Sequence, residues 1–365
     1  MIYFNDLKSQ WLEIKDSTMP EIAELFETSQ FILGPQVERF ENSFAKFCSC
    51  SYGVGVSNGT DAIKIAAKAL GLGRRPDVFM PANTFVATWL AVKEAYPNSK
   101  VIMIDIDQNG QMDTTKLNEK ITKGSLIVAV HMYGCCDNIE KIKTIADKNQ
   151  CLLMEDASQA HGAKTTRGTI AGSVGDIAAF SLYPGKNLGA AGDAGIITTN
   201  NETLAKKCKL LRNYGSEEKY IHKEIGHNHR LDSLQAIILY WKLEKLNGWN
   251  QSRSISANTI KLALDNPEVE WMLTDNPSQV YHILPVLLKN LEKRSAFMKY
   301  LNDNKVQCGI HYPVPIHKMP FYDKQEPDLT RTENYADRIV SLPIHPFMMD
   351  IEIQYIVDTI NKFRG

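Results

Sequence analysis

The sequence predicts an α/β fold, in which a large domain built on a mostly parallel sheet precedes a smaller α+β domain. Short, almost continuously apolar runs recur between amphipathic segments, a pattern typical of parallel sheets that helices cover on both faces. Near residue 245 the pattern changes to shorter apolar runs mixed with helical stretches. A chain of 365 residues is also long enough for two domains. We therefore expect domains at residues 1–245 and 246–365.

The first clear element is a helix within residues 57–71, which read SNGTDAIKIAAKALG. Apolar residues recur from Ile63 to Leu70 at the spacing i, i+3, i+4 and i+7, which predicts a helix that begins near Thr60. Gly71 follows the last apolar residue and is suited to end this helix.

Apolar runs predict the strands of the sheet. The runs lie at residues 78–85, 101–107, 125–131, 151–156, 176–182 and 194–200. Between two of them, residues 138–150 carry Ile139, Ile142 and Ile145 at helical spacing, with Asn138 in position to cap the helix. Because ligands of such sheets bind at the carboxyl ends of the strands, the residues just after each strand are the candidates for function.

The composition argues against several classes of protein. The chain has 41 basic and 42 acidic residues, so no excess of positive charge predicts binding to nucleic acid or to an anionic membrane. The N-terminus resembles no signal peptide, and no run of about 18 apolar residues predicts a membrane span. The seven cysteines are irregularly spaced and lack a C-x-x-C pair, so we expect a cytoplasmic protein without a metal site or disulfides.

The start of the first helix is a candidate anion site. Asn58, Gly59 and Thr60 lie where backbone N–H groups are free and the helix dipole is positive, which suits a phosphate group. An ordinary helix cap is the alternative interpretation. The segment is not a P-loop, because no G-K-[ST] follows it.

A second candidate lies in MEDASQAHG, residues 154–162, where Asp156 ends an otherwise apolar strand. A carboxylate at such a place needs a positive or protonated partner. Asp156 is therefore either the counter-ion of a cationic heterocycle, or a helix cap or partner of an interior arginine. His161 is either a base or a hydrogen-bonded loop histidine.

The third candidate is Lys186, in the glycine-rich loop SLYPGKNLGAAGDAG of residues 181–195. A lysine near a buried carboxylate can attack a carbonyl and form a Schiff base. Together, the helix start, Asp156 and Lys186 match the phosphate, ring nitrogen and aldehyde of pyridoxal 5′-phosphate (PLP). A nucleotide-dependent oxidoreductase is a competing hypothesis, but no G-x-G-x-x-G follows the first strand. A non-catalytic PLP-binding or sugar-nucleotide-binding relative is another.

Five motifs occur in a particular order: S-N-G-T-D-A, P-A-N-T-F-V-A-T, E-D-A-S-Q-A-H-G, F-S-L-Y-P-G-K-N-L-G-A and N-H-R-L-D-S-L-Q-A-I-I-L. In order and spacing they resemble the DegT/DnrJ/EryC1/StrS family of PLP-dependent sugar-nucleotide aminotransferases. The resemblance extends to I-H-Y-P-V-P-I-H near the C-terminus. It implies the aspartate-aminotransferase-like fold type I, with a mixed and mostly parallel sheet, and a homodimer with active sites at the subunit interface.

The resemblance also implies residue roles. Lys186 and Asp156 would be catalytic: Lys186 would bond to the cofactor and shuttle protons, and Asp156 would pair with the ring nitrogen. The other implied cofactor-binding residues are Asn58, Gly59, Thr60 and Ser181 around the phosphate, Asn228 from the partner subunit, Phe85 on the ring face and Gln159 near the ring oxygen. Three positions depart from the family pattern: Ser158, His227 and His229.

The resemblance narrows the reaction. The family's dehydratases carry histidine in place of Lys186, so a transaminase with L-glutamate as amino donor is expected. LRNYGSEEKY and PANTFVATWLAV resemble the subgroup that aminates C3 of dTDP-3-keto-6-deoxyhexoses, giving 3-amino-3,6-dideoxy sugars for surface glycans such as lipopolysaccharide. Amination at C4 is the alternative. Candidate substrate contacts, which packing or solvation could equally explain, are Tyr183, Asn187, Lys219, Tyr220, His311, Tyr312 and His317.

Overall fold

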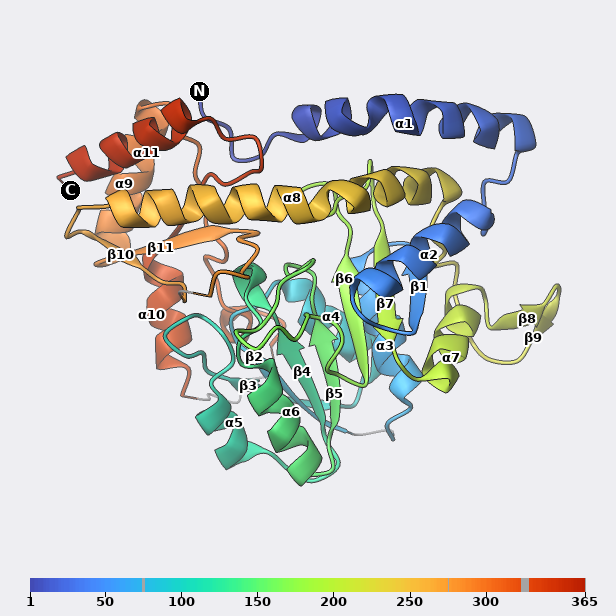
Figure 1. The fold of residues 1–365 in the computed structure, drawn as a ribbon. Coiled ribbons are helices and arrows are strands. Elements are labelled where there is room, and N and C mark those ends of the chain that lie inside the picture. Colours follow the sequence, from blue (N-terminus) through green and yellow to red (C-terminus); the bar gives the residue numbers. More distant parts are fainter. Residues whose placement is uncertain (74–75, 275, 323–327, 365) are drawn as a thin grey trace.

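A computed structural model describes residues 1–73, 76–274, 276–322 and 328–364. Its centre is a seven-stranded sheet with the strand order β1-β7-β6-β5-β4-β2-β3 (Figure 1). The strands are β1 (Tyr52–Val56), β2 (Asp77–Pro81), β3 (Lys100–Ile104), β4 (Leu126–Val130), β5 (Leu152–Asp156), β6 (Ile177–Ser181) and β7 (Gly195–Thr199). Strand β7 pairs antiparallel with both β1 and β6, and the other pairs are parallel. The predicted mixed, mostly parallel sheet is confirmed.

Each of the six apolar runs overlaps one of these strands, whereas β1 is absent from the prediction. Its sequence, YGVGV, alternates glycine with valine and therefore lacks a continuous apolar run. The glycines are needed because the chain packs closely here: a Cβ on Gly53 would come within 2.4 Å of the backbone oxygen of Glu41. Close approach to a neighbouring backbone is a common reason for glycine within a strand.

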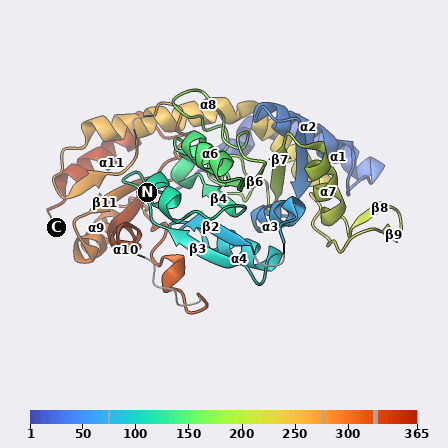
Figure 2. The same cartoon turned by 90° about the horizontal axis from the view of Figure 1, so that it is seen from below.

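Helices cover both faces of the sheet, which Figure 2 shows from below. Those of this part are α2 (Pro35–Phe47), α3 (Gly59–Leu70), α4 (Val86–Ala95), α5 (Thr114–Lys120), α6 (Ile139–Lys148) and α7 (Glu202–Arg212). Helices α3 and α7 pack on one face with α4 beside α3, and α2 and α6 pack on the other. Side chains of β4 alternate accordingly, since Val128 belongs to the core under α3 and Ile127 to the core under α6. This two-sided burial explains why the strands read as continuous apolar runs.

The helix predicted from residues 57–71 is α3. It begins at Gly59 and ends before Gly71, whose φ of 68° is the left-handed conformation that glycine adopts readily. The second predicted helix is α6, but the expected cap was wrong in detail. Asn138 occupies the capping position and its backbone oxygen accepts from the N–H of Ile142, but its side chain does not cap the helix, and its amide donates to the backbone oxygen of Met112 at 2.8 Å instead.

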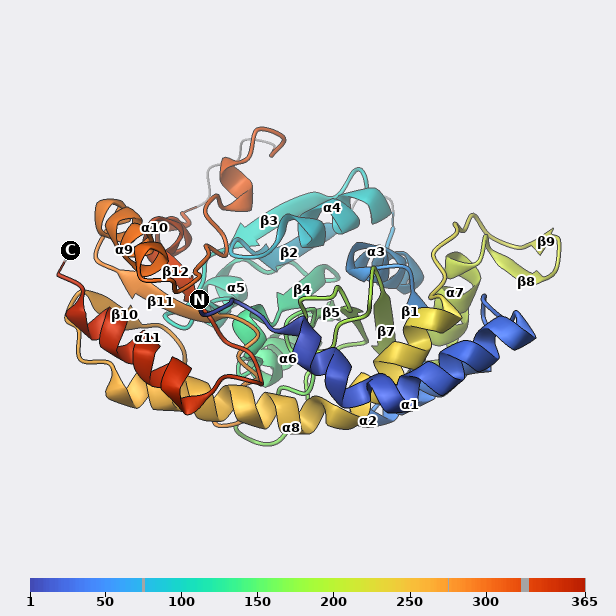
Figure 3. The same cartoon turned by 90° about the horizontal axis from the view of Figure 1, so that it is seen from above.

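A long helix, α8 (Ser233–Ala263), connects the large sheet to the C-terminal part (Figure 3). That part holds an antiparallel sheet of β10 (Val269–Trp271), β11 (Leu284–Leu288) and β12 (Ile339–Leu342), with helices α9 (Leu291–Asp303), α10 (Thr330–Arg338) and α11 (Asp350–Lys362). The domain boundary expected at residue 245 falls inside α8. The first residues of the chain also join the C-terminal part, because Ile2 pairs with Val306.

Two further features lie at the periphery. Helix α1 (Leu7–Thr28) packs against α8, and an arm made of β8 (Ser216–Glu218) and β9 (Ile221–His222) projects from the body after α7 (Figure 1). None of the helices in the described residues combines the length and apolar character needed to cross a membrane.

Candidate active site

A cavity of about 980 Å³ lies at the carboxyl ends of β4, β5 and β6, where ligands of such sheets are expected. The start of α3, the loops after β5 and β6 and the C-terminal part form its walls. The predicted site residues that line it are Asn58, Gly59, Thr60, Phe85, Asp156, Gln159, Ser181, Tyr183, Lys186, His311 and Tyr312. The fold thus brings together residues that are up to about 250 positions apart in the sequence.

The start of α3 is a capped helix end that borders the cavity. The side-chain oxygen of Asn58 accepts from the N–H of Asp61 at 2.8 Å. The N–H groups of Gly59 and Thr60 have no acceptor among the described residues and border the cavity. Gly59 also packs so tightly that an added Cβ would lie 2.5 Å from the Cβ of Ser181. This arrangement suits a phosphate group, because free N–H groups and the helix dipole both favour an anion.

Asp156 is only 4% exposed at the end of β5. Its Oδ2 accepts from the hydroxyl of Thr88 at 2.7 Å, and its Oδ1 accepts from the N–H of Ser158 at 3.2 Å. The hydroxyl of Thr84 contacts that of Thr88 at 2.8 Å. No arginine pairs with Asp156 in the described parts of the chain, so the carboxylate stays available to a cationic group in the cavity.

Lys186 lies half-buried in the loop after β6, and its backbone N–H donates to the oxygen of Tyr183 at 2.8 Å. Its amine makes no hydrogen bond or ion pair with any described residue. Burial lowers the pKa of this amine to about 8, although the charge of Asp156 acts in the opposite direction. The structure therefore places a partly neutral, unpartnered amine inside a cavity that also contains a carboxylate.

His161 is also buried in this region. Its Nε2 lies 2.9 Å from the backbone oxygen of Ser181, so this nitrogen carries the hydrogen and donates it. Burial, with a contribution from Lys186, lowers the pKa of His161 to about 3. Of the two alternatives, the hydrogen-bonded loop histidine is the one that the structure supports, because the ring stays neutral and holds the loop.

Tyr133 connects the sheet edge to the C-terminal wall of the cavity. Its backbone φ of 61° is unusual for a residue with a side chain, and three hydrogen bonds hold the residue in this conformation. Its N–H donates to Gln159 Oε1 at 2.7 Å, its hydroxyl donates to the backbone oxygen of His311 at 2.9 Å, and its backbone oxygen accepts from the N–H of His282 at 3.1 Å. Gln159 is thereby oriented, and its amide reaches the hydroxyl of Tyr312 at 3.4 Å.

The aromatic rings expected at the cofactor and substrate lie at the mouth of the cavity. Phe85 is 52% exposed just before α4, and its ring centre is 5.4 Å from that of Tyr312. Tyr183 is 58% exposed and also borders the cavity. An exposed aromatic face at a cavity mouth is suited to cover a planar ligand.

Asn187 and His317, expected as substrate contacts, do not line the cavity. The amide of Asn187 is 1% exposed and donates to Asn250 and to the backbone oxygen of Val280, both at 2.9 Å. The ring of His317 contacts Glu333 at 2.9 Å. The amide of Asn187 is therefore engaged within the protein, whereas His317 is engaged through Nε2 alone and its Nδ1 has no partner among the described residues.

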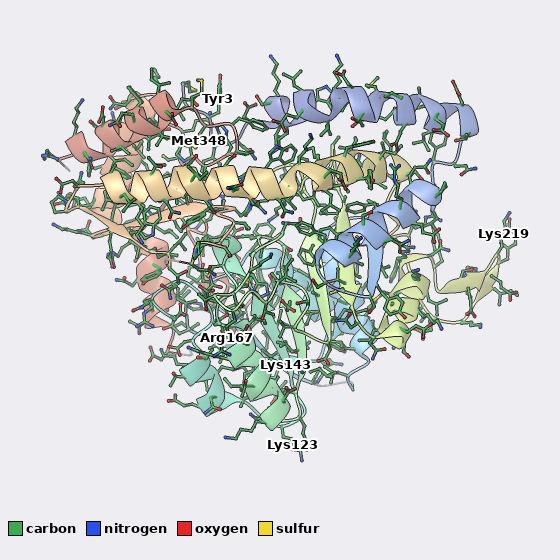
Figure 4. The ribbon with its side chains drawn as sticks, in the orientation of Figure 1. Tyr3, Lys123, Lys143, Arg167, Lys219 and Met348 are labelled. Atoms are coloured by element: carbon green, nitrogen blue, oxygen red, sulfur yellow. The ribbon has the colours of Figure 1, made fainter. Side chains whose placement is uncertain are left out.

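Lys219, Tyr220 and Asn228 also lie outside the cavity of their own chain. Lys219 is at the far end of the projecting arm (Figure 4), next to Tyr220, whose side chain is 82% exposed. Asn228 is exposed and pairs with Asn213 at the base of the arm.

Of the two unusual histidines, His229 contacts the Asp61 carboxylate through Nδ1 at 3.0 Å. Burial lowers the pKa of His229, so this ring adds no permanent positive charge beside the start of α3.

Several residues of the site are absent from the sequence-based prediction: Thr88, Tyr133, Arg253 and His282. Thr88 had a signal, since it lies one helical turn after Thr84 within the motif PANTFVAT. Arg253 and His282 lie in segments without a local motif, and only the folded chain shows that they line the cavity.

Comparisons with known proteins agree with this geometry. Residues 12–361 match the model of the DegT/DnrJ/EryC1/StrS aminotransferase family. The chain belongs to this family. Its resemblance to the family, inferred from five motifs, is thereby confirmed, and the chain is a PLP-dependent sugar aminotransferase of fold type I.

Two curated relatives are similar over almost their whole length. The dTDP-3-amino-3,6-dideoxy-alpha-D-galactopyranose transaminase of Aneurinibacillus thermoaerophilus is 38% identical, covering 100% of this chain and 99% of that protein. The dTDP-3-amino-3,4,6-trideoxy-alpha-D-glucose transaminase of Streptomyces venezuelae is 34% identical, covering 99% of this chain and 95% of that protein. The crystal structure of DesV from S. venezuelae superimposes with a TM-score of 0.93 at 33% identity, covering 99% of this chain and 98% of that one.

The cavity of this aminotransferase fits PLP on structural grounds. The unpartnered amine of Lys186 suits the cofactor's aldehyde, the buried carboxylate of Asp156 suits its ring nitrogen, and the free N–H groups at the start of α3 suit its phosphate. When bound, PLP supplies an electron-withdrawing ring that stabilises negative charge on the substrate carbon that bears nitrogen.

Proposed function

We propose that this aminotransferase moves the amino group of L-glutamate to C3 of a dTDP-3-keto-6-deoxyhexose, giving a dTDP-3-amino-3,6-dideoxyhexose of galactose or glucose configuration. The observation that carries the proposal is the likeness over the whole chain to two transaminases whose names specify dTDP-linked 3-amino sugars. The same motifs that resemble the C3 subgroup, PANTFVATWLAV and LRNYGSEEKY, support it. The product would serve surface glycan synthesis.

Within the site, Lys186 is the proton carrier. Because burial lowers the pKa of its amine to about 8, Lys186 can accept a proton from the substrate carbon and return it at neutral to mildly alkaline pH. Asp156, oriented by Thr88, holds a proton on the ring nitrogen of the cofactor through its negative charge. Gly59, Thr60 and Ser181 hold the phosphate, and Phe85 covers the ring at the cavity mouth. Tyr183, His311 and Tyr312 contact the sugar.

We further propose that the protein acts as a homodimer with shared sites. The arm carries strongly exposed side chains, including Tyr220 at 82% exposure, and Ile225 just after it is 86% exposed. A projecting arm of this kind can extend over a second copy of the chain. Asn228, Lys219 and Tyr220 would then reach the cofactor phosphate and the substrate of the partner subunit.

The test of regiochemistry is incubation of the holoenzyme and L-glutamate with dTDP-4-keto-6-deoxyglucose, with and without a 3,4-ketoisomerase. We expect an amino sugar only when the isomerase is present, and nuclear magnetic resonance of the product should place nitrogen on C3. An amino sugar formed without the isomerase, with nitrogen on C4, would refute C3 amination and support the C4 alternative.

A further inference from the structure

A second cation, which is buried, lines the cavity that contains Lys186. Arg253 projects from α8 and is 2% exposed. Its Nη1 donates to the backbone oxygens of Ile344 at 2.7 Å and Tyr281 at 3.4 Å. Within the described residues, Nη1 is the only nitrogen of this guanidinium that donates a hydrogen bond, and no carboxylate pairs with the group. A guanidinium has five N–H donors, so Arg253 retains donors for a ligand.

A buried charge without a counter-ion is costly, and proteins normally pair such a group. Burial lowers the pKa of Arg253 only to about 10, so the group stays positive at neutral pH. Of the acidic side chains that border the cavity, Asp61 and Glu94 contact Lys64, and neither Asp156 nor Asp193 forms an ion pair with the guanidinium in the described parts of the chain. The guanidinium of Arg253 therefore lines the cavity without a carboxylate partner among the described residues.

The neighbouring histidines do not share this charge. Burial lowers the pKa of His311 to about 4 and that of His282 well below its ordinary value, and the positive charge of Lys186 adds to both effects. Arg253 also lowers the pKa of His282, as expected for two groups that line the same part of the cavity. We call this part, formed by Lys186, Arg253, His282 and His311, the inner wall. Near neutral pH, the two cations of this inner wall are accordingly Lys186 and Arg253.

We propose that Arg253 binds the α-carboxylate of the amino-donor substrate; this inference rests on the proposed donor, L-glutamate. In an α-amino acid, the carboxylate is attached to the same carbon as the amine, so it must enter the inner cavity with the reacting nitrogen. In a sugar nucleotide, the diphosphate is attached to C1 of the sugar. The nucleotide is too large for the space beside Arg253, so it must extend past Phe85 and Tyr183 at the mouth of the cavity. A planar guanidinium matches a carboxylate with two parallel hydrogen bonds.

The experiment compares L-glutamate with its α-amide, L-isoglutamine, which lacks only the α-carboxylate charge. Apparent dissociation constants are measured from the loss of the visible absorption of the holoenzyme, in the wild type and in Arg253→Gln and Arg253→Lys. We expect the wild type to prefer L-glutamate by roughly 30-fold or more, since hydrogen bonds to charged groups contribute that much. Arg253→Gln should abolish the preference and Arg253→Lys should reduce it.

Two further measurements separate recognition from structural support. In both variants the reverse half-reaction with the dTDP-amino sugar should fall by much less than the half-reaction with L-glutamate, and direct binding of glutarate, an unreactive dicarboxylate, should weaken in calorimetry. Arg294→Gln is the matched control, because Arg294 also donates from Nη1 to a backbone oxygen, that of Ala336, but does not line the cavity.

An unchanged preference for L-glutamate in both variants would overturn the assignment, and so would an equal loss in the two half-reactions. A wild type that responds to the amino sugar but not to L-glutamate would instead overturn the proposed donor and, with it, the assignment.

Discussion

The environment of Lys186 decides its chemistry. In water a lysine amine is almost fully protonated at neutral pH, but here burial outweighs the attraction of Asp156 and lowers its pKa from 10.5 to about 8. The amine also has no hydrogen-bond partner among the described residues. A lysine with a lowered pKa and a free lone pair can act as a nucleophile and as a proton carrier.

The first prediction concerns pH. When the apoprotein is mixed with PLP, Lys186 must be neutral to bond to the aldehyde, so the initial rate should rise with pH through about 8 and then level off. The measurement is the appearance of visible absorption in a series of buffers. Asp156→Asn should move the rise to lower pH, because it removes the charge that favours the protonated amine. A rise centred near 10.5, the ordinary value for lysine, would contradict the assigned environment.

The second prediction concerns the role of Lys186 itself. Lys186→Ala should lower turnover by about 10²-fold or more, the usual contribution of a positioned acid–base group. The variant should still bind PLP, because the start of α3 and Asp156 remain. Turnover and cofactor retained after dialysis are the two measurements, and wild-type turnover in the variant would remove Lys186 from its role.

The third prediction concerns Thr88, which orients Asp156 through a 2.7 Å hydrogen bond. Thr88→Val removes that bond at nearly constant volume and should lower kcat by roughly tenfold or more, because hydrogen bonds to charged groups contribute about 1.5–3 kcal/mol. Thr88→Ser keeps the hydroxyl and should stay near wild type. Equal rates for the valine and serine variants would show that the bond does not matter for catalysis.

At the scale of elements, the start of α3 depends on a glycine that sits against β6. A Cβ on Gly59 would lie 2.5 Å from the Cβ of Ser181, so one of the two elements would have to move. That movement would widen the gap between the free N–H groups of α3 and Ser181. A single methyl group therefore tests whether these two elements bind the phosphate together.

The fourth prediction follows from this contact. Gly59→Ala should weaken PLP binding and lower the free energy of unfolding by about 1–3 kcal/mol, as overpacking usually does. Gly248→Ala is the control. Gly248 lies in α8, and a Cβ added there meets no neighbouring atom within 4 Å, so the change should raise the free energy of unfolding by up to about 1 kcal/mol. Urea unfolding and cofactor titration measure the two effects; normal PLP affinity in Gly59→Ala would refute the proposed cradle.

Helix α8 shows why element prediction from sequence was incomplete. It has 31 residues, yet it was not among the predicted helices. Its first half packs on α1 and α2, and further along it meets α11. Because its neighbours change along its length, its apolar residues do not keep to one face, and the single-stripe pattern that revealed α3 and α6 is missing.

At the scale of the whole molecule, the proposed sharing of active sites between two subunits leads to the fifth prediction. Lys186→Ala and Asn228→Ala chains should each be weakly active alone, whereas a dissociated and reassociated mixture should regain activity. In a mixed dimer, one site combines the intact Lys186 of one chain with the intact Asn228 of the other, so about a quarter of all sites are restored. Activity no higher than the average of the two parents would show that Asn228 does not act across the interface.

The sequence alone determined the α/β class, the start of α3, the strand runs and the positions of Asp156 and Lys186 after their strands. These features depend on local periodicity and on short motifs, which are visible in contiguous residues. The tertiary structure alone decided which distant side chains meet: Thr88 on Asp156, Tyr133 between Gln159 and His311, and Arg253 on the inner wall. Such contacts depend on how loops and helices pack in space, and a linear pattern carries no direct record of that packing.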